Sequence, residues 1–108
     1  MWIKLKGRQH VDITSPSWAR ILEIACKLGW VDECETKGPE VTSLQWDVYD
    51  YPDHNARALA KVLYSVIHDI EADCLSEALV QLVNEAGVGN MRRVADLAYA
   101  GFFYVDPG

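Results

Sequence analysis

The sequence predicts an α+β fold: a small antiparallel sheet packed by about four helices. Short stretches near the N-terminus alternate apolar and polar residues with the period of a β-strand. Longer stretches further on place apolar residues three and four positions apart, as an amphipathic helix does. The composition is that of a globular protein, since half of the 108 residues are hydrophobic and about a quarter are charged. We therefore expect a single domain, residues 1–108.

The first expected element is a β-hairpin. Residues 2–6 and 10–14 both alternate, and the Gly-Arg-Gln segment between them is typical of a turn. A middle strand is expected over residues 43–49, where Leu, Trp and Val alternate with polar residues. The aromatic and β-branched run at residues 102–105 predicts a final strand. These strands would form the antiparallel sheet.

Four helices are expected from apolar periodicity and from capping residues. Ser15 followed by Pro16 predicts the N-cap and first position of the first helix, and Gly29 predicts its end. Asp53 and Asn90 are further predicted caps. The predicted helices lie near residues 16–28, 54–70, 75–86 and 91–100. Their core residues are expected to be Trp18, Ile21, Leu22, Leu59, Leu63, Ile67, Leu79 and Leu97.

The cysteines and the N-terminus indicate a cytoplasmic protein. Three cysteines at spacings of eight and forty fit no zinc motif, so we expect reduced thiols. Cys26 is predicted to be a small buried residue and Cys34, among acidic neighbours, to be exposed. The N-terminal segment alternates and lacks the apolar core of a signal peptide. No stretch is long and apolar enough to span a bilayer.

The distribution of charge is the feature that bears most on function. The net charge of the chain is −6. Residues 32–53 contain seven acidic residues and one lysine, and residues 69–85 contain five acidic residues and no basic residue. Such fields repel nucleic acid and anionic membranes and attract basic proteins. Interleaved tyrosines are favoured interface anchors. The predicted partner-binding residues are Asp32, Glu33, Glu35, Asp47, Tyr49, Asp50, Tyr51 and Asp53.

Catalytic and cofactor motifs are absent from the sequence. There is no nucleophile elbow, no phosphate-binding lysine loop and no paired-histidine metal motif. The leading hypothesis is therefore a non-enzymatic inhibitor without a cofactor. An alternative is a divalent-metal or small-ligand site, or an enzyme, that uses Asp47, Asp50, Asp53 and His54. A third reading is a structural subunit in which the acids only confer solubility.

Three segments resemble a group of small uncharacterised bacterial and phage proteins. Residues 17–30 (SWARILEIACKLGW) resemble the group's Trp-containing helix that ends in Gly-Trp. Residues 56–63 resemble its middle segment, and residues 98–103 resemble its Gly-aromatic C-terminal strand. The size and acidity are also similar to those of phage anti-CRISPR and toxin-immunity proteins. That likeness implies an inhibitor that blocks a basic, nucleic-acid-binding surface of a defence or toxin protein.

Overall fold

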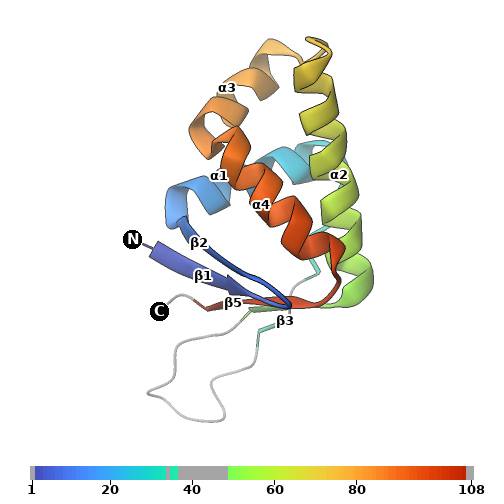
Figure 1. Ribbon diagram of the computed structural model, residues 1–108. Helices are drawn as coiled ribbons and strands as arrows, with labels where there is room; N and C mark the ends of the chain where they lie inside the picture. Colours follow the sequence, from blue (N-terminus) through green and yellow to red (C-terminus); the bar gives the residue numbers. More distant parts are fainter. Residues whose placement is uncertain (1, 34, 37–48, 107–108) are drawn as a thin grey trace.

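The computed structural model describes residues 2–33, 35–36 and 49–106, and it confirms the α+β fold. The described residues form five strands and four helices, with the helices gathered on one side of the sheet (Figure 1). The strands are β1 (Trp2–Lys6), β2 (His10–Thr14), β3 (Glu35–Thr36), β4 (Tyr49–Tyr51) and β5 (Phe103–Asp106). The helices are α1 (Ser15–Lys27), α2 (Asp53–Glu71), α3 (Glu77–Ala86) and α4 (Val88–Tyr99).

The sheet is antiparallel throughout, in the order β2-β1-β5-β4-β3. The predicted hairpin forms with Ile3 opposite Ile13 and Leu5 opposite Val11. The C-terminal strand β5 takes the central position, pairing with β1 on one side and β4 on the other. The first and last strands therefore lie beside one another, because Lys4 in the middle of β1 is opposite Asp106 at the end of β5.

The middle strand differs from its prediction. Residues 43–48 lie outside the described residues, and β4 begins at Tyr49, continuing to Tyr51, two residues beyond the predicted end. The strand extends because Tyr51 pairs with Phe103 of β5 and buries its ring. Local alternation alone does not specify this tertiary contact.

The starts of all four described helices also differ from their predictions. Thr14, rather than Ser15, caps α1, and its hydroxyl accepts the backbone N–H of Ser17. Pro52 occupies the cap position of α2, so Asp53 is the first helical residue. Ser76 caps α3, and α4 begins at Val88 without a side-chain cap, which places Asn90 inside the helix.

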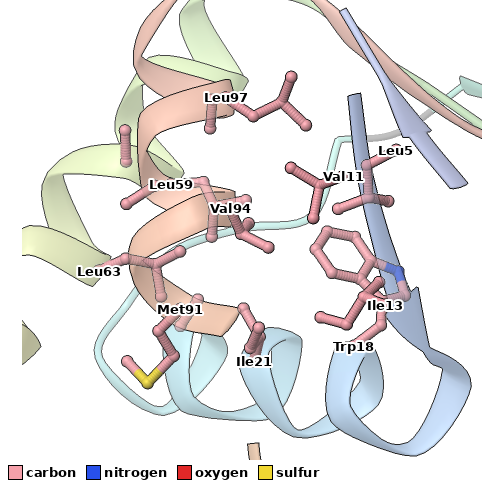
Figure 2. Close-up of a cluster of buried hydrophobic side chains, with 14 of the residues drawn as sticks. Leu5, Val11, Ile13, Trp18, Ile21, Leu59, Leu63, Met91, Val94 and Leu97 are labelled. Atoms are coloured by element: carbon pink, nitrogen blue, oxygen red, sulfur yellow. The ribbon is translucent and has the colours of Figure 1, made fainter. Parts of the chain in front are cut away.

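The core lies between the sheet and the helices, and Figure 2 shows residues from β1, β2, α1, α2 and α4 converging on it. The predicted core residues are buried, except Leu22 and Leu79, which are partly buried at its edge. Helix α4 packs against α2, and α3 packs against α1. Leu63 is fully buried in this core.

The described cysteines are free thiols, and both are exposed. This corrects the prediction that Cys26 is buried: the residue lies beside the apolar stripe of α1, on its solvent side. Cys34 lies outside the described residues. Among the described helices, none combines the length and the hydropathy needed to cross a bilayer.

Candidate functional site

The first predicted partner-binding residues, Asp32 and Glu33, lie in the loop that follows α1. Gly29, at φ +99°, adopts the left-handed conformation that stops the helix. The N–H of Gly29 donates to the Cys26 carbonyl at 3.1 Å, and the N–H of Trp30 donates to the Ala25 carbonyl at 3.0 Å. These two hydrogen bonds form a Schellman motif. It reverses the chain so that the Trp30 side chain enters the core.

An aromatic cluster lies beneath the acidic segment. Tyr51 stacks on Phe103 with ring centroids 4.9 Å apart, and it also stacks with Trp30 at 6.1 Å. Trp18 meets both Tyr51 and Phe103 edge-on. Tyr51 is 2% exposed, which corrects its prediction as a surface anchor. Its ring stabilises the fold, and only its hydroxyl reaches the surface network.

Asn55 holds the loop that follows α1. Its side-chain amide donates to the Val31 carbonyl at 2.7 Å and accepts the backbone N–H of Glu33 at 3.1 Å. The same amide donates to the Glu33 carboxylate at 3.4 Å, and the Asn55 carbonyl accepts the indole N–H of Trp30 at 3.1 Å. Asn55 is 2% exposed, so its polar groups depend on these partners.

We call Asp32 and Glu33 the acidic corner. Both are exposed on the loop that Asn55 fixes. The Tyr51 hydroxyl donates to the Asp32 carboxylate at 3.2 Å, and Nε2 of His54 lies 3.1 Å from the Glu33 carboxylate. These contacts hold the carboxylates of two exposed residues on a backbone that Asn55 anchors at the Val31 carbonyl and the Glu33 N–H.

Asp53 points elsewhere, although it is next to His54 in the sequence. Its carboxylate accepts the backbone N–H of Phe102 at 2.6 Å. Gly101 precedes that residue at φ +108°, and a Cβ there would lie 2.8 Å from the Asp53 carboxylate. Asp53 therefore fixes the turn between α4 and β5, and it does not belong to the acidic corner.

The remaining predicted partner-binding residues are divided among other places. Asp50 is partly buried in β4, on the opposite face of the strand from Tyr51. Its backbone pairs with Glu35 and with Tyr104, while Tyr49 pairs with Thr36 and Val105. Asp47 lies outside the described residues.

The alternative metal site is not supported by the described part of the chain. Asp53 binds Phe102, His54 contacts Glu33, and Asp50 occupies the strand. Within residues 2–33, 35–36 and 49–106, no three acidic, histidine or cysteine side chains are grouped closely enough to hold a metal ion.

The second acidic block is partly neutralised by arginines from other helices. Glu71 lies 3.3 Å from Arg92, and Glu85 lies 2.8 Å from Arg20. Asp73 is exposed in the turn between α2 and α3 with φ +57°. This block is therefore less negative than its sequence suggests.

Tyr64 takes part in a separate polar contact between α2 and α4. Its hydroxyl donates to the Asp96 carboxylate at 2.5 Å. Partial burial, together with this hydrogen bond, raises the pKa of Tyr64 to about 12. The phenol stays protonated near neutral pH, so it joins the two helices and supplies no base.

Asn55 was the residue that sequence reasoning missed. It lies four positions before Leu59 and therefore on the apolar stripe of α2, where a polar residue requires hydrogen-bond partners if it is buried. A polar residue on that stripe was the available signal. The partners themselves come from a loop more than twenty residues earlier, which local periodicity does not identify.

Comparisons of the chain with protein-family models, with curated proteins and with solved structures found no match. The resemblance to small bacterial and phage proteins therefore stays a prediction.

Proposed function

We propose that this protein is a non-enzymatic binding protein whose acidic corner docks on a basic surface of another protein. Asp32 and Glu33 project from the most acidic segment of the chain. A negative field of this kind speeds the encounter with a basic partner and disfavours anionic ones. Docking by exposed carboxylates also requires no catalytic group or cofactor.

The observation that carries the proposal is the anchoring of the acidic loop by buried Asn55. A binding loop gains affinity when it is ordered before it meets its partner. Two hydrogen bonds of the Asn55 side chain hold the backbone on both sides of Asp32, at the Val31 carbonyl and the Glu33 N–H. Two more bind the Trp30 indole and the Glu33 carboxylate. The loop is thus preorganised, and little entropy is lost on docking.

The expected target is a basic, nucleic-acid-binding protein of a defence or toxin system. Carboxylates that occupy its arginines and lysines would displace phosphate groups from the same surface. The protein would then act as an inhibitor, in the manner of anti-CRISPR or immunity proteins. This target class rests on charge and on the sequence resemblance.

The proposal is tested with a short polyarginine peptide as the basic probe. Asp32→Asn combined with Glu33→Gln should slow association with the peptide about tenfold at low salt, and rising salt should remove the difference. Stopped-flow fluorescence of a labelled peptide measures the association rates of the wild-type protein and of the double variant at each salt concentration.

The matched control is Asp73→Asn combined with Glu77→Gln, which changes the net charge equally in the other acidic block. It should slow association much less, because position and not only net charge decides docking. Equal effects of the two double variants, or association that does not depend on salt, would contradict the proposal. Either result would favour the alternative in which the acidic residues only confer solubility.

A further inference from the structure

A second surface of opposite character lies where the β1–β2 turn meets the start of α2 and the start of β5. It is a shallow cleft of about 440 Å³. We call it the basic-aromatic cleft and define it by six of its lining residues: Lys6, Arg8, Asp53, Arg57, Phe102 and Tyr104. Its volume falls within the range of about 300–1,000 Å³ of small-molecule sites.

Three cations line this cleft in a protein whose net charge is −6. Lys6 lies 3.5 Å from the Asp106 carboxylate. Arg8 and Arg57 are exposed, and within the described part of the chain neither has an ion-pair partner. By contrast, Arg20 and Arg92 are each paired with a glutamate. The cleft thus presents two unpaired guanidinium groups, which suit the oxygens of a phosphate.

Two aromatic rings line the same cleft. Phe102 is 48% exposed, and its ring centroid lies 6.5 Å from that of Tyr104, which is partly exposed. Exposed rings beside arginines offer a stacking surface for a planar ligand, and nucleobases stack on such rings in many proteins.

The backbone around the rings is fixed in advance. The Asp53 carboxylate holds the N–H of Phe102 at 2.6 Å. On the other side, a Cβ at Gly7 would lie 3.1 Å from the Phe102 carbonyl oxygen, so the hairpin turn fits closely only without a side chain there. The two turns therefore fix the backbone of Gly7 and Phe102, from which the cleft residues extend.

We propose that the basic-aromatic cleft binds a single nucleotide. The base stacks on Phe102, and Arg8 and Arg57 bind the phosphate. Asp53 positions Phe102 and, as a carboxylate inside the cleft, limits how much anionic charge the cleft accepts. This site is distinct from the acidic corner and does not depend on the function proposed for it.

Charge favours a free nucleotide over a nucleic-acid strand. Asp50 is opposite Tyr104 in the sheet and Asp106 lies two residues after it, and together with the net charge of −6 these acids would repel the further phosphates of a strand. A single phosphate meets two arginines and the one carboxylate of Asp53 in the cleft, whereas exposed charges more than about 10 Å away are largely screened by salt.

The test is a titration of the ¹⁵N-labelled protein with adenosine 5′-monophosphate, followed by NMR. Saturable shifts are expected at Gly7, Arg8, Gly101 and Phe102. Arg8→Ala or Arg57→Ala should each weaken binding about tenfold, as expected for a lost hydrogen bond to a charged group. Phe102→Leu, which keeps an apolar residue but removes the ring, should weaken binding about tenfold.

The matched control is Arg92→Ala, which removes the same charge from α4, where Arg92 pairs with Glu71. It should leave the affinity unchanged within twofold. Inorganic phosphate and adenosine separately should each bind at least tenfold more weakly than the nucleotide. Three results would overturn the proposal: no saturable shifts, equal affinity for inorganic phosphate, or tighter binding of a single-stranded oligoadenylate than of the monophosphate.

Discussion

The acidic corner and the basic-aromatic cleft are both built on the first turns of α2, yet they carry opposite charge. Asp53 and Arg57 are four residues apart and line the cleft, while His54 and Asn55 face the loop after α1. The helix thus separates neighbours in the sequence onto two surfaces. A block of charge in a sequence is therefore no measure of a patch on a protein. Of the acidic side chains that the structure describes in the first block, Asp32 and Glu33 meet in the corner, whereas Asp50 lies in β4 and Asp53 lines the cleft.

The largest effect is expected from a substitution in the hydrophobic core, which supports both surfaces. Leu63 is fully buried in the core beneath both, and Leu63→Ala should lower the free energy of unfolding by about 2–5 kcal/mol. Urea denaturation measures this, with exposed Lys61→Ala as the control. Because one core supports both surfaces, peptide and nucleotide binding should be lost at the same urea concentration. Loss of one well before the other would show that the two surfaces are supported independently.

A smaller effect is expected on the cleft alone. Gly101→Ala places a side chain at φ +108° and 2.8 Å from the Asp53 carboxylate, so it should destabilise the protein by about 1–3 kcal/mol. The amide resonance of Phe102 should shift, because its hydrogen bond to Asp53 is disturbed. Resonances of residues 31–33 should stay in place.

Gly89→Ala serves as the control for this substitution. Gly89 lies within α4, and a Cβ there would meet nothing within 4 Å. The replacement should be neutral or stabilising by up to about 1 kcal/mol. Equal losses of stability at Gly89 and Gly101 would contradict the role assigned to the turn between α4 and β5.

The smallest effect should fall on the acidic corner. Asn55→Ala removes the partners of the Val31 carbonyl and the Glu33 N–H, and water can reach this edge of the loop. We expect a loss of about 1–2 kcal/mol, within the range for unsatisfied polar groups. Hydrogen exchange of the Glu33 amide should accelerate, whereas that of the Phe102 amide should not.

Asn84→Ala, on the exposed side of α3, is the control for the amide loss and should change stability by less than about 0.5 kcal/mol. If Asn55→Ala accelerated exchange equally at Glu33 and Phe102, the two surfaces would not be separable.

The elements that sequence predicted best are those whose signal is local. The hairpin at residues 2–6 and 10–14 and the helix stripe through Leu63 follow from periodicity that each segment carries by itself. The central position of β5 was not predictable in this way, because it depends on pairing between the two ends of the chain. Burial of Tyr51 likewise results from contact with Phe103, fifty-two residues later.

The candidate site was predicted only in part, for the same reason. The sequence identified the acidic residues, and Asp32 and Glu33 are exposed as expected. It did not identify the buried amide of Asn55 that fixes them. It also did not identify the basic-aromatic cleft, because Arg8, Arg57 and Phe102 come from three distant segments, and only folding brings them together.

The aromatic cluster beneath the acidic corner has an optical consequence. Tyr51 stacks with both Phe103 and Trp30, and Trp18 meets it edge-on, so these rings have fixed asymmetric surroundings. Rings held in this way give a circular dichroism signal in the near ultraviolet, which disappears when tertiary packing loosens while secondary structure persists. Trp30 also bonds to the Asn55 carbonyl. The near-ultraviolet signal of the folded chain thus reports, without a label, whether the aromatic cluster beneath the acidic corner is intact.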